Sequence, residues 1–541
     1  MKKAIIFAPH QDDEINIAGG ILSSLLANNI EVKVVYSTNG DYCTKASTRI
    51  SECKKALKVF GISEENIYFM GYSDQTREED THLYMTEKNS IWKSKKNIMK
   101  TYHPFGENEV SMIYEKKHHE FNKDNFIKDI VYVLEDYKPD YIYCIDFDSH
   151  ADHRALSLSV EKAIGLLINK HIDYRPIIYK AFAYPTFYYG YKDLNNINIK
   201  STAFKTEPYS YCDMENPYYS WASRIRFPVS EKVCNKFLLK NKVFSALNCH
   251  KSQCINGRAS STINGDQIFW QRRTDNLLNE SKLTVTSGNM EKLHDFMLFD
   301  CNNIMGGDSK KVVLESNAWM PDKNDKVPEI NVSFNKKKKI SEINLYHAIG
   351  TSDFFNKIEV IADNDYSNTY ELVREKDNIS RLNFDDNIFT KNLKIRMLGK
   401  TGDNAGFSEL EVFEFSDSLI QLIKLEIDGD FAYKYYYSNE SFKIYSYDGV
   451  KFRYLDKDEY KIISDDVIVE NDKFLLKKHS NNIRVQLKNN DTIYDDVILV
   501  KKNIISVINN IIINIVNSVV VAICYSKQKI IRKIKRLLKV N

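Results

Sequence analysis

Apolar runs of strand length alternate with helix-like segments over the first part of the chain. The strand-like runs include Ala4–Ala8, Glu31–Ser37 and Tyr141–Ile145, which are apolar or rich in β-branched residues. Between them, Ile15–Asn28 and Thr48–Phe60 carry apolar residues at helical spacing. This alternation predicts an α/β domain built on a parallel, doubly wound sheet. Such sheets place their ligands at the carboxyl ends of the strands, so the residues that follow each strand are the first functional candidates.

Short strand-like runs replace this alternation from about residue 284. They are separated by turn residues and include Glu329–Phe334, Ile340–Tyr346, Lys357–Ala362, Leu393–Met397 and Ser408–Phe415. Short strands at this spacing predict an all-β domain of sandwich size. The basic run Lys336–Lys339 falls between two of these strands, and we expect it to be a solvated turn. A further β-rich stretch extends from about Leu419 to Val500.

The length of 541 residues requires several domains, because one domain usually has about 100–200 residues. We divide the chain into an α/β domain at 1–283, a β-sandwich at 284–416, a small β domain at 417–502 and a helical tail at 503–541. The hydrophobic fraction of 43% and the charged fraction of 28% exclude a disordered scaffold and a polytopic membrane protein. The wealth of Asn, Ile, Lys and Tyr fits an AT-rich bacterial genome.

The tail carries positive charge that the net value of +3 conceals. From Asn503 onward there is no acidic residue, and the basic residues are Lys527, Lys529, Arg532, Lys533, Lys535, Arg536 and Lys539. The remaining body is therefore mildly acidic, which excludes a nucleic-acid binder on charge. Asn510, Asn514 and Asn517 fall on one helical face of an otherwise apolar stretch, and an apolar and basic amphipathic segment follows. This pattern is typical of helices on membrane surfaces.

The nine cysteines are irregularly spaced and form no CxxC pair, so we expect reduced thiols rather than disulfides. The first residues lack the long apolar stretch of a signal peptide, and we expect a cytoplasmic protein. A spanning tail would then export its basic cluster, against the positive-inside rule. We therefore expect the tail to lie on the anionic inner face of a membrane, with a packing or oligomerising helix as the alternative.

Two polar clusters directly follow two of the predicted strands. The first is His10–Glu14 (HQDDE), and the second is Asp146–Arg154 (DFDSHADHR). Hydrolysis at zinc needs three nitrogen or oxygen ligands, an open position for water and a separate carboxylate as base. His10, Asp13 and His153 could supply the ligands, with Asp12 as the base. The alternative is a pair of polar loops whose Asp residues cap helices. The metal site is favoured over it because both clusters follow corresponding strands and could meet at one point.

These clusters resemble the signature motifs of the LmbE/PIG-L family of zinc-dependent N-deacetylases. His10–Glu14 resembles the AHPDDE motif and His150–His153 resembles the HPDH motif. The resemblance continues through Ser37–Gly40, Arg49–Glu52 and Gly71–Asp74, and covers about the first 280 residues. It implies a Rossmann-like fold, removal of acetyl from N-acetylglucosamine-type groups, and binding of Zn²⁺ by His10, Asp13 and His153.

The same resemblance implies roles for other residues of the motifs. Asp12 would be the general base acting on water, and protonated His150 would stabilise the tetrahedral oxyanion. Asp152 would orient one of the histidines. Arg49 and Asp74 match positions that hold sugar hydroxyls in relatives, whereas a helical ion pair and a turn are their structural alternatives.

Two positions depart from the family pattern. Gln11 replaces a proline, which changes only the rigidity of the loop. Asp148 stands where relatives often carry a tyrosine as an oxyanion donor, and an ionised aspartate cannot donate a hydrogen bond. Another group, for example a tyrosine of the aromatic stretch that includes Tyr188–Tyr191, must replace it, or the step is weaker.

Residues from about 290 to 416 resemble a discoidin, or F5/8 type C, domain, a jelly roll that often binds carbohydrate. The matching segments are Asn317–Trp319, Ile340–Ile343 and Gly406–Phe413. A carbohydrate ligand and a purely structural role are equally expected here. The leading hypothesis is a zinc-dependent N-deacetylase acting on an N-acetyl amino sugar in glycolipid or surface-polysaccharide metabolism. The alternatives are a carbohydrate-binding protein with a silent LmbE-like domain and an amidohydrolase for another N-acyl conjugate.

Overall fold

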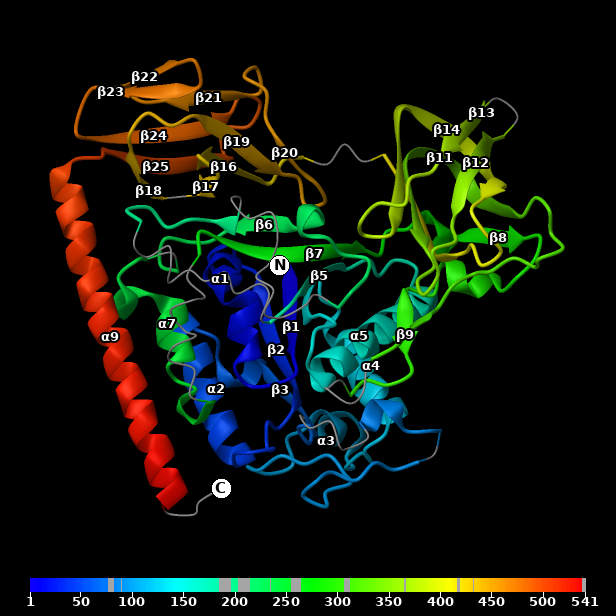
Figure 1. The fold of residues 1–541 in the computed structure, drawn as a ribbon, viewed down its shortest axis with the longest axis horizontal. Coiled ribbons are helices and arrows are strands. Elements are labelled where there is room, and N and C mark those ends of the chain that lie inside the picture. The colour runs from blue at the N-terminus through cyan, green and yellow to red at the C-terminus, as the bar shows by residue number, and fades with distance from the viewer. Residues whose placement is uncertain are drawn as a thin grey trace.

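The N-terminal part of the chain forms one seven-stranded sheet with the strand order β3-β2-β1-β4-β5-β7-β6 (Figure 1). The computed structural model describes residues 1–75, 82–88, 90–183, 196–202, 215–233, 235–253, 264–305, 312–363, 366–415, 419–431 and 433–537. The strands of this sheet are β1 (Lys3–Ala8), β2 (Glu31–Thr38), β3 (Ile67–Tyr72), β4 (Tyr141–Ile145), β5 (Ile177–Ala181), β6 (Ile225–Pro228) and β7 (Asp266–Arg273). The first five are parallel and β7 is antiparallel to both its neighbours, so the predicted α/β class is confirmed.

Helices cover this sheet, and their order along the chain defines where a ligand site can form. They are α1 (Asp13–Ala27), α2 (Ala46–Phe60), α3 (Val110–Glu115), α4 (Lys123–Tyr137), α5 (Ala151–Lys170) and α7 (Lys242–Leu247). From β1 the chain proceeds to β2 and β3 on one side, and later to β4 and β5 on the other. The carboxyl ends of β1 and β4 therefore flank the topological switch point, where open α/β sheets bind ligands.

An antiparallel β-sandwich follows the α/β domain. Its main sheet has the order β13-β12-β14-β11-β15, with β8 paired to β11, and β9 and β10 form a separate pair. The strands are β8 (Ser281–Val285), β9 (Phe299–Cys301), β10 (Leu314–Ser316), β11 (Glu329–His347), β12 (Phe355–Ala362), β13 (Tyr366–Glu371), β14 (Ile379–Lys400) and β15 (Phe407–Glu414). Apolar residues of β8, β11, β12, β14 and β15 form one core that also buries Trp319, whereas β9 packs into a neighbouring cluster.

The expected turn at Lys336–Lys339 is wrong, because β11 runs through it without interruption. The pairing with β14 shifts register between Ser333 and Lys338, which is where the strand accommodates the extra residues. Lys338 is buried, and its Nζ lies 2.9 Å from Glu280 Oε1 and 3.2 Å from Glu414 Oε2. The two carboxylates compensate its charge, so a basic run is tolerated within a strand.

The third domain is also built of short antiparallel strands around its own apolar core. Its sheets have the orders β17-β16-β19-β20, β18-β25-β24-β21 and β22-β23, with β18 and β25 parallel. The strands are β16 (Leu422–Ile427), β17 (Asp430–Phe431), β18 (Lys434–Tyr437), β19 (Phe442–Tyr447), β20 (Phe452–Tyr454), β21 (Tyr460–Ile463), β22 (Val467–Glu470), β23 (Lys473–Leu476), β24 (Ser480–Leu487) and β25 (Tyr494–Lys501). A single helix, α9 (Ile504–Leu537), then runs along the side of the α/β domain (Figure 1).

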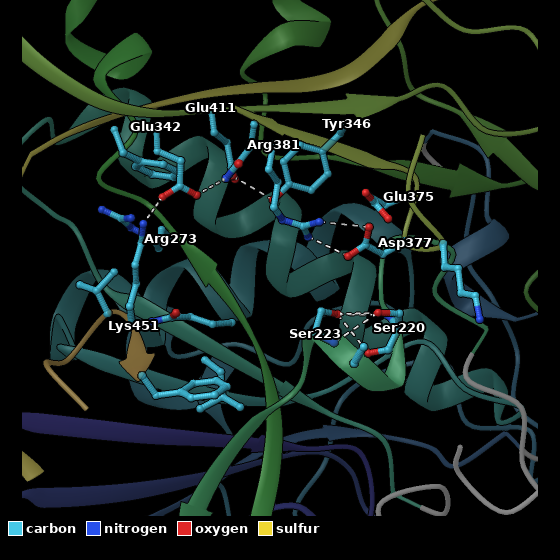
Figure 2. A pocket seen from close by; sticks show the side chains of 18 residues that line it. Ser220, Ser223, Arg273, Glu342, Tyr346, Glu375, Asp377, Arg381, Glu411 and Lys451 are labelled. Carbon is cyan, nitrogen blue, oxygen red and sulfur yellow. Dashed lines mark hydrogen bonds and ion pairs between the residues drawn. The ribbon is translucent and has the colours of Figure 1, made fainter. Parts of the chain in front are cut away.

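A polar cavity of about 740 Å³ lies where the three domains meet (Figure 2). Ser220 and Arg273 line it from the α/β domain, Tyr346 and Arg381 from the sandwich, and Lys451 from the third domain. Many of its charged groups pair with one another. For example, Arg381 Nη2 donates a hydrogen bond to Asp377 Oδ2 at 2.7 Å. The cavity is therefore a polar joint between domains and is separate from the carboxyl edge of the large sheet.

Candidate metal centre

Two loops at the carboxyl ends of β1 and β4 carry the polar clusters singled out in the sequence. β1 ends at Ala8 and α1 begins at Asp13, while β4 ends at Ile145 and α5 begins at Ala151. Because β1 and β4 are parallel neighbours, the two loops start side by side. The fold thus brings together side chains that lie more than a hundred positions apart in the sequence.

Three histidines and one aspartate converge between these loops. Ligand atoms of His10, His150 and His153 all lie within 4.8 Å of one another. Asp13 Oδ2 lies 3.1 Å from His10 Nδ1 and 3.3 Å from His153 Nε2. Tetrahedral ligands bound at about 2.0–2.1 Å from zinc are separated by roughly 3.3 Å, and the two distances from Asp13 to His10 and His153 match this separation. His10 and His150 also form a second, overlapping group with Asp74 and Asp152.

The remaining ring nitrogens of two of these histidines contact buried carboxylates. His10 Nε2 donates to Asp152 Oδ2 at 2.9 Å, and His153 Nδ1 donates to Asp148 Oδ2 at 2.9 Å. This arrangement leaves His10 Nδ1 and His153 Nε2, the two atoms that face Asp13, for a metal ion. Carboxylates that fix the tautomer and orientation of a ligating histidine are a regular feature of metal sites.

Asp148 stands out in the sequence only as a missing oxyanion donor, and its contact with His153 is a finding of the structure. Asp148 also accepts the backbone N–H of His150 at 3.0 Å, so it shapes the loop between β4 and α5. The tyrosines Tyr188–Tyr191, suggested as replacement donors, lie outside the described residues.

His82 is a further residue of the centre that sequence reasoning missed. Its Nε2 lies 2.9 Å from Asp152 Oδ1, and its Nδ1 accepts the backbone N–H of Tyr84 at 3.0 Å. Nδ1 is therefore unprotonated, and Nε2 carries the proton that is donated to Asp152. Asp152 Oδ2 also accepts the backbone N–H of Gln75 at 2.9 Å. His82 belongs to neither motif, and a single histidine 70 positions before Asp152 gives no spacing signal.

The charges of the centre favour a bound cation. Burial opposes positive charge on His10, but the neighbouring carboxylates, Asp74 foremost, outweigh burial and hold the pKa of His10 well above its usual value. Burial likewise opposes charge on His153, yet Asp148 and Asp13 raise the pKa of His153 to about 9. A set of buried carboxylates that draws protons onto its histidines has the electrostatics expected where a metal cation binds.

Asp12 lies at the start of α1 in an unusual backbone conformation. Its φ of 138° is in a region that non-glycine residues rarely adopt. The conformation is held by the Asp12 N–H, which donates to Glu14 Oε2 at 2.8 Å, and by neighbouring Gln11, whose side chain donates to the Thr38 carbonyl at 2.8 Å. Gln11 therefore fastens the loop to β2 by a hydrogen bond, where the family pattern has a proline.

The structure places Arg49 and Asp74 at the same centre, each with protein partners. Arg49 Nη2 donates to the Gln11 carbonyl at 2.7 Å and lies 3.4 Å from Asp12 Oδ1. Asp74 Oδ1 lies 3.5 Å from His10 Nε2, and the Asp74 N–H donates to Asp41 at 2.8 Å. Both side chains are buried. Arg49 thus lies beside Asp12, the expected base, and Asp74 lies beside His10.

The His and Asp centre lies at the switch point of a doubly wound sheet. This is an arrangement in which a hydrolase can hold a metal ion. Residues 5–164 match the family described as GlcNAc-PI de-N-acetylase (PIG-L), and residues 294–412 match the F5/8 type C domain. The chain therefore contains a PIG-L domain, of the hydrolytic N-deacetylase class, followed by an F5/8 type C domain. Both resemblances seen in the sequence are confirmed. A comparison with curated proteins finds no match.

Solved structures similar to parts of the chain include deacetylases and carbohydrate-binding modules. The N,N'-diacetylchitobiose deacetylase of Pyrococcus horikoshii is 15% identical, with a TM-score of 0.27, and the match covers 50% of this chain and 84% of that one. A teicoplanin deacetylase is 12% identical, with a TM-score of 0.30, over 51% and 99% of the two chains. A family 32 carbohydrate-binding module of C. perfringens, solved with galactose, is 20% identical, with a TM-score of 0.19, over 26% and 96%.

Proposed function

We propose that the chain is a zinc-dependent deacetylase that releases acetate from an N-acetyl amino sugar of the N-acetylglucosamine type. The observation that carries the proposal is the meeting of His10, Asp13 and His153 beside a separate carboxylate, Asp12, at the switch point of a PIG-L domain. His10, Asp13 and His153 would hold the metal. Bound zinc would lower the pKa of a water molecule and polarise the acetamide carbonyl.

In this proposal Asp12 takes the proton of the attacking water. Proton transfer to a positioned side chain contributes roughly 10²–10⁴-fold to a rate. Two features support Asp12 as the base, since its backbone conformation is held by neighbouring hydrogen bonds and Arg49 lies 3.4 Å from its Oδ1. Arg49 would hold the Asp12 carboxylate in place beside the reacting water. This role differs from the direct sugar contact that the family resemblance implies for Arg49.

His150 would donate a hydrogen bond to the tetrahedral oxyanion. Burial, together with His10 and His153, holds the pKa of His150 well below its usual value, which favours a neutral ring over the protonated ring that the family resemblance implies. Its Nδ1 accepts the Asp152 N–H at 3.2 Å, which leaves the proton on Nε2. A neutral N–H donor fixed in advance can stabilise an oxyanion without reorganisation.

The substrate class is tested by measuring acetate release from a panel of N-acetylated sugars and lipid-linked N-acetylglucosamine, using protein of measured zinc content. Turnover of one or more of these substrates with about one zinc per chain is expected. Bound zinc with release from a different N-acyl conjugate would favour the other amidohydrolase. Sugar binding without acetate release from any substrate would favour a carbohydrate-binding protein with a silent domain.

We also propose that residues 294–412 bind a carbohydrate, which would hold the enzyme at a polymeric or surface-bound substrate. The support is the match to the F5/8 type C domain. Titration of galactose, N-acetylglucosamine and their oligomers, followed by tryptophan fluorescence and calorimetry, tests this role. Saturable binding supports it, and the absence of binding to the whole panel would assign the domain a structural role.

A further inference from the structure

α9 turns the amides of Asn510 and Asn517 toward the protein and a row of isoleucine and valine side chains away from it. Asn510 and Asn517 are buried, with exposed fractions of 8% and 3%. The apolar side chains that are each at least half exposed are Ile504, Ile505, Ile508, Ile511, Ile512, Ile515, Val519, Ile523 and Ile530. This polarity is the inverse of a surface helix on a globular domain, which buries its apolar face.

Specific hydrogen bonds fix this orientation. Asn517 Oδ1 accepts the Leu238 N–H at 3.1 Å, and Asn517 Nδ2 donates to the Lys236 carbonyl at 2.8 Å. The Lys236 ammonium also donates to Asn510 Oδ1. Near the other end of the contact, Val520 and Val521 pack against the core of the α/β domain. Asn510 and Asn517, two of the amides that interrupt the apolar sequence, therefore attach α9 to the protein and determine which face points outward.

The outward residues form one continuous stripe. At 3.6 residues per turn, the nine exposed apolar positions fall within a sector about 120° wide. From Ile504 to Ile530 the stripe extends for roughly 40 Å, whereas apolar side chains on the surface of a monomer are usually scattered singly. A stripe of this size marks an interaction surface.

We propose that this stripe lies in the plane of an anionic lipid surface, with the α/β domain held against the membrane by the opposite face of α9. The seven basic residues after Cys524 and the absence of Asp and Glu from Asn503 onward provide the matching charge. The inference concerns attachment alone and goes beyond the proposed deacetylase function.

Other occupants fit the observations less well. By length and composition Ile504–Cys524 could cross a membrane, but crossing would break the contacts of Asn510 and Asn517 with the α/β domain. A second copy pairing through α9 would bring no acidic residue of α9 to face the basic segment. An anionic lipid surface satisfies both the apolar stripe and the charge.

The test is flotation of the full-length protein with vesicles of phosphatidylcholine alone or with about 30% phosphatidylglycerol. The test variant is the triple substitution Ile508→Gln, Ile512→Gln and Ile515→Gln, which keeps helix-forming residues along α9. The matched control places the same substitution at the exposed apolar residues Leu166, Val373 and Leu419, for which no contact with α9 is found in the described part of the chain.

We expect binding to the anionic vesicles at least tenfold stronger than to phosphatidylcholine, at least tenfold weaker binding of the α9 variant, and a change below twofold in the control. Equal unfolding temperatures of the three proteins would exclude misfolding as the cause. No binding to vesicles, equal binding to both compositions, or an equal loss in the control would overturn the proposal. A wild-type protein that does not bind vesicles but forms a dimer, which the α9 substitutions dissociate, would also overturn it. Resistance of the protein to alkaline carbonate extraction from membranes would indicate a spanning helix and would overturn it too.

Discussion

At the scale of single residues, the centre is organised by groups that need not touch a substrate. Asp152 accepts hydrogen bonds from His10, from His82 and from the backbone N–H of Gln75, which follows β3. Asp148 accepts a hydrogen bond from His153. These side chains are all buried. Because each carboxylate fixes the tautomer of the ring that it contacts, metal affinity depends on residues beyond the ligands.

Removing the imidazole of His82 should weaken zinc binding without removing a ligand. We expect His82→Leu to lower zinc affinity about 10–100-fold, since Asp152 loses the donor that holds its second oxygen. His82→Gln, whose amide can still donate to Asp152, should retain more of the affinity. Competition with a chromophoric chelator measures both variants. Unchanged affinity in His82→Leu would exclude His82 from the centre.

The parts of the site that the sequence could predict are those with a spacing signal. His10, Asp12 and Asp13 fall in one short motif, and His150 with His153 in another, each at the end of a recognisable strand. His82 meets Asp152 only in the folded chain, and neither sequence motif includes it. The lowered pKa of His150 also depends on its burial and on its neighbours His10 and His153, which the sequence does not specify.

At the scale of elements, the pattern of polar and apolar residues predicts where strands and helices lie better than it predicts which of their polar residues are buried. The run Lys336–Lys339 lies within β11 because Glu280 and Glu414, from other segments, compensate Lys338. The sequence predicts that Asn510, Asn514 and Asn517 share one face of a helix. Only the structure identifies Lys236 and Leu238 as hydrogen-bond partners of Asn510 and Asn517. In both cases a distant segment decides what a polar residue does.

The attachment of α9 should depend on Asn517 more than on its exposed counterpart Asn509. Asn517→Ala would leave the buried Leu238 N–H and Lys236 carbonyl without their partner, a cost of about 1–3 kcal/mol. Hydrogen exchange along α9 should then speed up by roughly 5–150-fold, the equivalent of that free energy. Asn509→Ala serves as the control and should change exchange little. Equal protection in wild type and Asn517→Ala would contradict this attachment.

At the scale of the whole molecule, side chains that cross domain boundaries make one body of the three domains. Arg226 of β6 donates to Asp266 at 2.7 Å within the α/β domain and to Glu426 of the third domain at 3.0 Å. Tyr218 of the α/β domain donates to the His347 carbonyl of the sandwich at 2.7 Å. The proposed segments 1–283, 284–416 and 417–502 are therefore joined by buried polar contacts as well as by the chain.

Breaking the Arg226 network should uncouple the third domain. Arg226→Met leaves buried Asp266 and Glu426 without their cation, which costs roughly 3–5 kcal/mol. Calorimetry should show the third domain unfolding as a separate transition at lower temperature. Arg453→Met, at an exposed ion pair with Glu459, is the control and should cost less than about 1 kcal/mol. A single unshifted transition in Arg226→Met would refute the coupling.

The central claim is that Asp12 activates water at a zinc ion held by His10, Asp13 and His153. The most direct measurement is acetate release by Asp12→Asn and wild type at equal, measured zinc content, with the remote exposed substitution Asp173→Asn as control. We predict that Asp12→Asn keeps its zinc and loses roughly 10²–10⁴-fold in turnover, while the control matches wild type and His10→Ala loses both metal and activity. Full turnover by zinc-loaded Asp12→Asn would contradict the account.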